Sequence, residues 1–294
     1  MFSYFYLGIF SIFCLFVLDV YVTEYFITSF LPLLLWVWKK YLRDKKIIFP
    51  LAAAIIAGVF MGIADQFRHH SATGLIITLI LFLLFAAGAE FKYKLLFIGL
   101  MLLFMPLCNI YFSGKISQRN TWLKENTGMK DFGNLSNHAF WHSLYTGLGF
   151  ADNKYGITWS DFNSFDKAKQ LNPALDISGY NISPEYEATL RGEYLSILKN
   201  DPLFVMKTYA RKFIYILLFI FLFFNYGFVL LRKVKPSWKI ILLLIPGITF
   251  HLLPGILVYP LPMYMLAAFN LLVMYEMFLL NEFLDRHKFE NPAS

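Results

Sequence analysis

The chain has 294 residues, of which 58% are hydrophobic and only 15% are charged. Soluble globular domains carry about 25% charged residues, so this composition argues against a soluble protein and favours a membrane protein. The formal net charge of +7 could indicate nucleic-acid binding, but the basic residues cluster in short loops beside apolar runs, so we expect no nucleic-acid partner.

The apolar runs predict an all-α fold, a polytopic membrane helix bundle of about eight spans. A membrane-spanning helix needs ~20 mostly apolar residues. The segments that approach this length are, in chain order, 2–18, 22–38, 47–65, 74–90, 95–112, 210–231, 240–258 and 262–280. The second segment has a short uninterrupted run because it contains Glu24, so it either crosses the membrane or re-enters from the same face.

Two basic loops give the bundle a consistent orientation. One loop contains Lys39, Lys40, Arg43, Lys45 and Lys46, and the other contains Arg232, Lys233, Lys235 and Lys239. The positive-inside rule places both loops in the cytoplasm. The chain then divides into residues 1–112 with five spans, an extracytoplasmic and partly helical insertion at 113–209, and residues 210–294 with three spans and a cytoplasmic tail. Both termini are predicted to be cytoplasmic in a multi-pass protein of the cell membrane.

The short loops on the predicted outer side carry ionisable residues close to the membrane. Asp19 and Glu24 lie between the first two spans. The stretch "ADQFRHH" between the third and fourth spans contains Asp65, Arg68, His69 and His70. Charged groups at the ends of spans are costly and are candidate functional residues. Outward cations run against the positive-inside bias and suit an anionic headgroup or diphosphate, whereas Asp19 and Glu24 are equally compatible with ordinary polar loop tips.

The outer insertion contains an unusual polar stretch, "NHAFWHSLYTGLGFADNKYGITWSD", at residues 137–161. Asn137 can cap a short helix that ends near Gly147 or Gly149. On such a helix one face, at positions i, i+3, i+4 and i+7, consists of His138, Trp141, His142 and Tyr145. Asp152 follows in a turn, and Asp161 follows on "TWSD".

Three interpretations of this aromatic and imidazole stripe are open. The rings can be buried in a helix that packs on other helices, which is what aromatic stripes usually do. Alternatively, the face binds a substrate, with rings against sugar faces and His or Asp side chains against hydroxyls or phosphate. A metal site is a third interpretation, because His138 and His142 have ligand spacing, but no further ligand is specified and we assign none. No cofactor can be named from the sequence.

Two helix starts are predicted in the second half of the insertion. Ser183, Pro184 and Glu185 supply an N-cap, a proline at the first helical position and an acid in the first turn. The helix "PEYEATLRGEYLSILKN" should follow. Asp201 and Pro202 should start another helix, which we expect to continue into the sixth span.

The layout resembles the integral-membrane glycosyltransferases of the GT-C class, in which an acid of the first external loop is the catalytic base. The resemblance implies this role for Asp19 or Glu24, and phosphate binding for Arg68, His69 and His70. It places "FWHSLYTGLGFADNKYG" in an outer domain. The stretches "WHSLYTGLG", "NKYGI", "SPEYE" and "LRGEYL" also resemble segments of uncharacterised bacterial polytopic membrane proteins. The span number is lower than usual in the GT-C class, and the first external loop is shorter.

These observations favour a cell-envelope enzyme that transfers a sugar from a polyprenyl-phosphate-linked donor at the outer face of the membrane. The partners would be membrane lipid and the lipid-linked sugar. The alternative is a non-enzymatic transporter, flippase accessory or scaffold. An enzyme requires the acids, the cations and the aromatic stripe to converge on one cavity, whereas a scaffold would leave them scattered.

Overall fold

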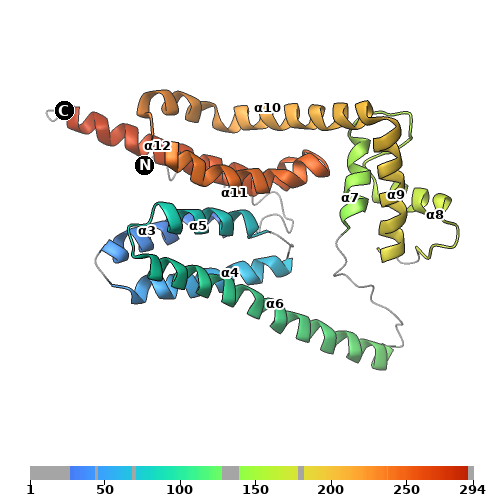
Figure 1. Ribbon diagram of the computed structural model, residues 1–294, viewed down its shortest axis with the longest axis horizontal. Coiled ribbons are helices and arrows are strands. Elements are labelled where there is room, and N and C mark those ends of the chain that lie inside the picture. Colours follow the sequence, from blue (N-terminus) through green and yellow to red (C-terminus); the bar gives the residue numbers. More distant parts are fainter. Residues whose placement is uncertain are drawn as a thin grey trace. The chain divides into compact units, whose positions relative to one another are not determined.

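The structure is a computed structural model that describes residues 27–43, 46–67, 71–127, 139–177, 182–236 and 238–290. Every regular element within these ranges is a helix, which confirms the predicted all-α class. The chain divides into two compact units (Figure 1). Unit 1 comprises Met1–Lys115, Ile220–Leu252 and Met263–Ser294, and unit 2 comprises Ile116–Phe219 and Leu253–Pro262.

Unit 1 is built from long apolar helices. They are α3 (Leu31–Arg43), α4 (Ile48–Phe67), α5 (Thr73–Phe85), α6 (Phe91–Thr127) as far as Lys115, α10 (Pro202–Val234) from Ile220, α11 (Trp238–Leu257) as far as Leu252, and α12 (Leu266–Glu290). A 3-10 turn, η3 (Pro262–Met265), precedes α12. The buried core of this unit joins residues of α3, α4, α5, α6 and α12.

Five of the described helices are long and apolar enough to cross a membrane: Ile48–Gln66, Phe91–Asn126, Pro202–Val234, Ile240–Leu257 and Pro262–Arg286. These agree with five of the predicted spans and support a multi-pass membrane protein. The predicted span 74–90 is wrong in length, because α5 has only 13 residues and ends at Phe85. The predicted span 2–18 and the start of 22–38 lie outside the described residues. The total number of about eight spans therefore stays a prediction.

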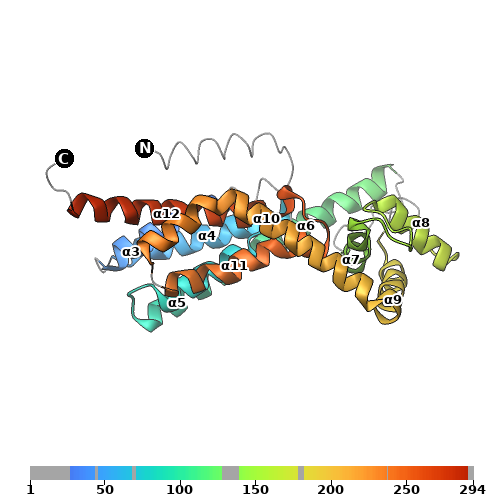
Figure 2. The ribbon, with the colours of Figure 1, turned by 90° about the horizontal axis from the view of Figure 1, so that it is seen from above.

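Small residues allow close helix contacts in unit 1. Gly58 and Gly62 form a GxxxG pattern on α4, where an added Cβ would lie 2.6 Å from the carbonyl oxygens of Met101 and Met105 on α6. The two helices lie side by side in both views (Figures 1 and 2). Close backbone approach through small residues is typical of membrane helices, which gain no hydrophobic energy by leaving lipid.

A second close contact joins α5 to α11. A Cβ on Gly247 would lie 2.1 Å from Thr78 Oγ1, and a Cβ on Gly74 would lie 2.3 Å from His251 Cδ2. His251 is 2% exposed. It therefore packs inside the helix bundle, as interior histidines usually do.

Helix α10 contains a break in unit 1. Phe224 has non-helical torsion angles (φ −124°, ψ 20°). The carboxylate of Glu276 on α12 accepts a hydrogen bond from the backbone N–H of Gly227, just after the break. Glu276 thus supplies an acceptor to the helix turn that the break disturbs.

Unit 2 is a separate helical assembly around its own core. It contains α7 (Phe140–Gly147), the 3-10 turn η1 (Leu148–Phe150), α8 (Asp161–Leu171), α9 (Pro184–Asn200), the first part of α10 and residues 253–262. Tyr145, Leu148, Tyr186 and Leu190 are among its most buried side chains. The packing of α7 against α9 and α8 positions the candidate site.

The predicted start of α9 is confirmed. Ser183 is the N-cap, and its Oγ accepts a hydrogen bond from the backbone N–H of Tyr186 at 3.1 Å. The helix has the predicted limits, Pro184–Asn200. The next helix begins at Pro202, as predicted, and continues to Val234. Asp201 Oδ1 accepts from the N–H of Phe204 at 3.1 Å.

Replacing Ser183 by alanine should destabilise unit 2 modestly. The loss of a capping hydroxyl costs about 1 kcal/mol of helix stability. Thermal unfolding of the detergent-solubilised protein would measure this loss as a lower Tm. Ser196→Ala, on the exposed face of the same helix, is the control and should leave Tm nearly unchanged. Equal effects of the two substitutions would contradict the capping role.

Candidate functional site

The first turn of α7 is capped by a side chain from another helix. Asn137, the predicted cap, lies outside the described residues, and the observed N-cap position is Ala139, which has no side-chain cap. Instead, the carboxylate of Glu187 on α9 accepts hydrogen bonds from the backbone N–H groups of Trp141 and His142, at 2.7 and 2.9 Å. A carboxylate at a helix N-terminus also interacts favourably with the helix dipole. Glu187 therefore fixes the start of α7 against α9.

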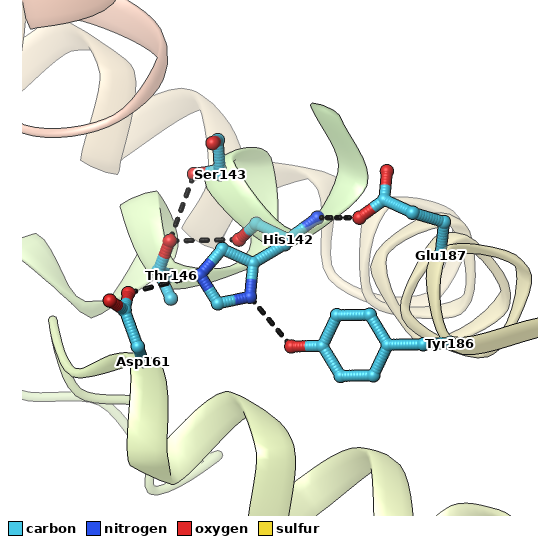
Figure 3. A network of polar contacts seen from close by, with 6 residues as sticks. All are labelled: His142, Ser143, Thr146, Asp161, Tyr186 and Glu187. Atoms are coloured by element: carbon cyan, nitrogen blue, oxygen red, sulfur yellow. Dashed lines mark hydrogen bonds and ion pairs between the residues drawn. The ribbon is translucent and has the colours of Figure 1, made fainter. Parts of the chain in front are cut away.

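His142 is the centre of a polar network (Figure 3). Its Nδ1 lies 2.6 Å from the hydroxyl of Tyr186, and its Nε2 lies 3.0 Å from Oδ1 of Asp161. The carbonyl oxygen of His142 accepts a hydrogen bond from Thr146 Oγ1 at 2.8 Å. Helices α7, α8 and α9 thus each contribute a member of one hydrogen-bonded chain.

The carboxylate of Asp161 sets the direction of these hydrogen bonds, because it can only accept. Nε2–H of His142 therefore donates to Asp161. Tyr186 is fully buried, and this burial, followed by the nearby charges of Glu187 and Asp161, raises the pKa of its phenol. The phenol of Tyr186 therefore stays protonated, and it donates to Nδ1 in the tautomer of His142 that carries its proton on Nε2.

The network runs from the core of unit 2 to its surface. The side chain of His142 is 9% exposed, whereas that of Asp161 is 78% exposed. Among the described residues, no second partner contacts the carboxylate of Asp161. One oxygen of this carboxylate is held by His142, and the other is available to a ligand.

The rest of the stripe is divided between core and surface. Tyr145 is 1% exposed and belongs to the core of unit 2. Trp141 is half-buried, with the Arg191 guanidinium 5.5 Å from the centre of its ring and the Tyr194 ring 5.9 Å away. Of the three stripe residues that the structure describes, Tyr145 and His142 fit the packing interpretation, and only Trp141 keeps a partly open ring.

The other predicted site residues are not brought to this network by the described structure. Asp152 is exposed in unit 2. Asp65 is buried in unit 1 at the end of α4, with its Oδ2 3.5 Å from Nδ2 of Asn109 on α6. The remaining predicted residues lie outside the described ranges: Asp19, Glu24, Arg68, His69, His70 and His138. Their convergence with the stripe on one cavity therefore stays a prediction.

The metal interpretation concerns His138 and His142, of which the structure describes only His142. Among the described residues, no group of three or more His, Cys, Asp and Glu side chains is placed to hold a metal ion. His142 uses both ring nitrogens in the hydrogen bonds to Tyr186 and Asp161. It would have to give up one of these bonds to coordinate a metal.

A buried lysine in unit 2 was missed by the sequence reasoning. Lys212 on α10 is fully buried, and its Nζ donates to the carbonyl oxygens of Val258 at 2.8 Å and Leu257 at 3.3 Å. Gly147 lies at the same place, since a Cβ there would be 2.2 Å from the Leu257 oxygen and 2.9 Å from Nζ. Lys212 thereby holds α10 to the segment 253–262, and the end of α7 packs against the same carbonyl oxygens.

The network has a clear chemical capacity. A carboxylate held by an imidazole and open to solvent can accept a proton from a hydroxyl group placed within hydrogen-bond distance. Tyr186 and Glu187, which orient the network, could have been suspected from the acidic first turn "SPEYE", but nothing in that turn indicates their contact with α7.

No family model, curated protein or solved structure matches this chain.

Proposed function

We propose that this protein is a cell-envelope enzyme that transfers a sugar from a polyprenyl-phosphate-linked donor to an acceptor hydroxyl at the outer face of the membrane. The observation that carries the proposal is the exposed Asp161 carboxylate, held by His142 and backed by the buried Tyr186. Five membrane-length apolar helices supply the setting in which a lipid-linked donor is available.

The proposed step is a proton transfer coupled to sugar transfer. The carboxylate of Asp161 accepts the proton of the acceptor hydroxyl. The acceptor oxygen forms a bond to the anomeric carbon of the sugar, and the bond between that carbon and the phosphate oxygen breaks. Polyprenyl phosphate leaves with the bonding electrons. His142 is a positioning residue, because its Nε2–H holds the carboxylate in place and Tyr186 fixes its tautomer.

The residues suggested by the resemblance keep their proposed roles. Asp19 and Glu24 remain candidates for the base, and Arg68, His69 and His70 remain candidates for binding the phosphate. These five residues lie outside the described ranges. Asp161 is the candidate base whose hydrogen bonds and exposure the structure describes.

A second candidate function is a non-enzymatic scaffold. The observation in its favour is that His142 has both ring nitrogens engaged and that Tyr145 is buried. In that case the network serves to hold α7, α8 and α9 together. The two candidates differ in what happens when Asp161 is changed, because the exposed carboxylate contributes little to folding but is essential to the transfer.

The test uses the purified protein in lipid nanodiscs with polyprenyl-phosphate-linked sugars and hydroxyl acceptors. Release of polyprenyl phosphate, followed by mass spectrometry, should exceed that of empty nanodiscs. Asp161→Asn should lower this rate by about 100-fold, a typical contribution of a general base, with little change in Tm. Asp166→Asn, on the same helix and also exposed, is the matched control and should keep the full rate.

One outcome would overturn the proposed transferase function, and another would overturn only the role of Asp161. If no donor is consumed by the unchanged protein, the scaffold function is favoured. If donor is consumed but Asp161→Asn and Asp166→Asn have equal rates, the transferase function survives and Asp161 is not its base. Asp19→Asn and Glu24→Gln would then be measured in the same assay.

A further inference from the structure

Unit 1 contains a large apolar cavity of about 750 Å³. Its walls come from α3, α5, α11 and α12, and most of the side chains that line it are aliphatic or aromatic. Along α3 the lining extends from Leu31 to Lys39, which corresponds to roughly 12 Å at the helical rise of about 1.5 Å per residue. Ligand-binding cavities in proteins commonly have volumes of this order.

A charged group distinguishes this cavity from an apolar gap between helices. Lys39 lines it and is exposed, and it has no ion-pair partner within the described part of the chain. Tyr275 on α12 also lines it, but the Tyr275 hydroxyl is buried and does not open into the cavity.

A neighbouring cavity provides an internal comparison. It measures about 370 Å³, is lined by residues such as Phe30, Ala52 and Phe60, and has no charged residue in its lining. Lipid chains can fill any apolar gap in a membrane, but only the larger of these two cavities combines apolar walls with a cation. The occupant of the larger cavity should therefore have an apolar chain and an anionic head.

We propose that the larger cavity binds one anionic phospholipid, with an acyl chain between the helices and its phosphate at Lys39. Charge complementarity selects the anionic head, since Lys39 lies near the end of α3, in the basic segment that is predicted to face the anionic cytoplasmic leaflet. The site is independent of the proposed transferase site, because all its residues belong to unit 1.

The first experiment measures lipid retention by native mass spectrometry. The full chain is reconstituted with equal amounts of phosphatidylglycerol and phosphatidylcholine, extracted in mild detergent and ejected from the micelle. One phosphatidylglycerol should remain bound in preference to phosphatidylcholine. Lys39→Gln should reduce this preference about five-fold, as expected for one lysine near an anionic headgroup. Lys40→Gln should leave the preference unchanged, because Lys40 does not line the cavity. Its Nζ lies 4.8 Å from the centre of the Trp36 ring.

The second experiment fills the cavity. Ala86→Trp places a large side chain at an exposed position in its lining, whereas Ala52→Trp does the same in the smaller cavity. Ala86→Trp should abolish retention, and Ala52→Trp should leave it intact. Equal retention of the two lipids, an equal effect of the two tryptophans, or displacement of the phospholipid by stoichiometric polyprenyl phosphate would each overturn the proposal.

Discussion

Gly147→Ala is expected to cause a large loss of stability in unit 2. The new Cβ would lie 2.2 Å from the carbonyl oxygen of Leu257 and 2.8 Å from that of Val258. Both are backbone atoms and both accept hydrogen bonds from Lys212, so they cannot move without breaking these bonds. Overpacking of this kind costs about 3 kcal/mol. With roughly 2–4 °C lost per kcal/mol, thermal unfolding in detergent should show a clear fall in Tm.

Gly192→Ala is the matched control for this prediction. Gly192 lies on the exposed face of α9, and a Cβ there would meet no atom within 4 Å. Alanine is favoured over glycine inside helices, so this substitution should raise stability by about 0.5–1 kcal/mol. If Gly147→Ala also raised Tm, the close approach of α7 to residues 257 and 258 would be wrong.

Glu187→Gln should separate α7 from α9 and lower the free energy of unfolding by about 2 kcal/mol. The carboxylate accepts two backbone N–H groups, one with each oxygen. Glutamine has only one acceptor oxygen, and its NH₂ group would face an N–H donor. A hydrogen bond to a charged group contributes about 1.5–3 kcal/mol, so the loss of one such bond accounts for the expected change. Tm and the hydrogen-exchange rates of the Trp141 and His142 amides would measure it.

Glu185→Gln is the control for the capping role of Glu187. Glu185 also lies in the first turn of α9 and is exposed, so both substitutions remove a negative charge near the same helix terminus. This shared effect on the helix dipole is worth only about 0.5 kcal/mol. Faster exchange at Trp141 and His142 should therefore occur in Glu187→Gln alone. Equal exchange in the two variants would show that Glu187 does not cap α7.

Local sequence signals predicted much of the fold. The limits of α9 were obtained from Ser183 and Pro184, because an N-cap and a first-turn proline act within a few residues. The continuation of α10 from Pro202 into an apolar segment was also predicted correctly. Composition alone overestimated the segment 74–90, because apolar residues continue to Ala89 although the helix ends at Phe85. A count of apolar residues does not detect where a helix stops.

Contacts between distant parts of the chain could not be predicted. The stripe correctly placed His142 and Tyr145 on one helix, α7. The hydrogen-bond partners of His142 include Tyr186 and Glu187, which belong to α9, and Glu187 follows His142 by 45 residues. The carbonyl partners of Lys212 are equally distant. Periodicity identifies which residues share a face, whereas only the tertiary structure shows what that face meets. The sequence therefore predicted His142 and Asp161 as candidate site residues, but it did not predict the residues that orient them.

Unit 2 is built from two separate parts of the chain, so it can fold completely only after the second part has been synthesised. Residues 253–262 belong to this unit but are made after α10 and most of α11. Leu257 follows Lys212 by 45 residues, which takes a few seconds at about 5–20 residues per second. During this interval the ammonium group of Lys212 has neither of its carbonyl partners. A nascent chain arrested before Leu253 should consequently contain an incomplete unit 2 that is sensitive to proteases. Only a chain in which the ribosome has passed Pro262 should be resistant.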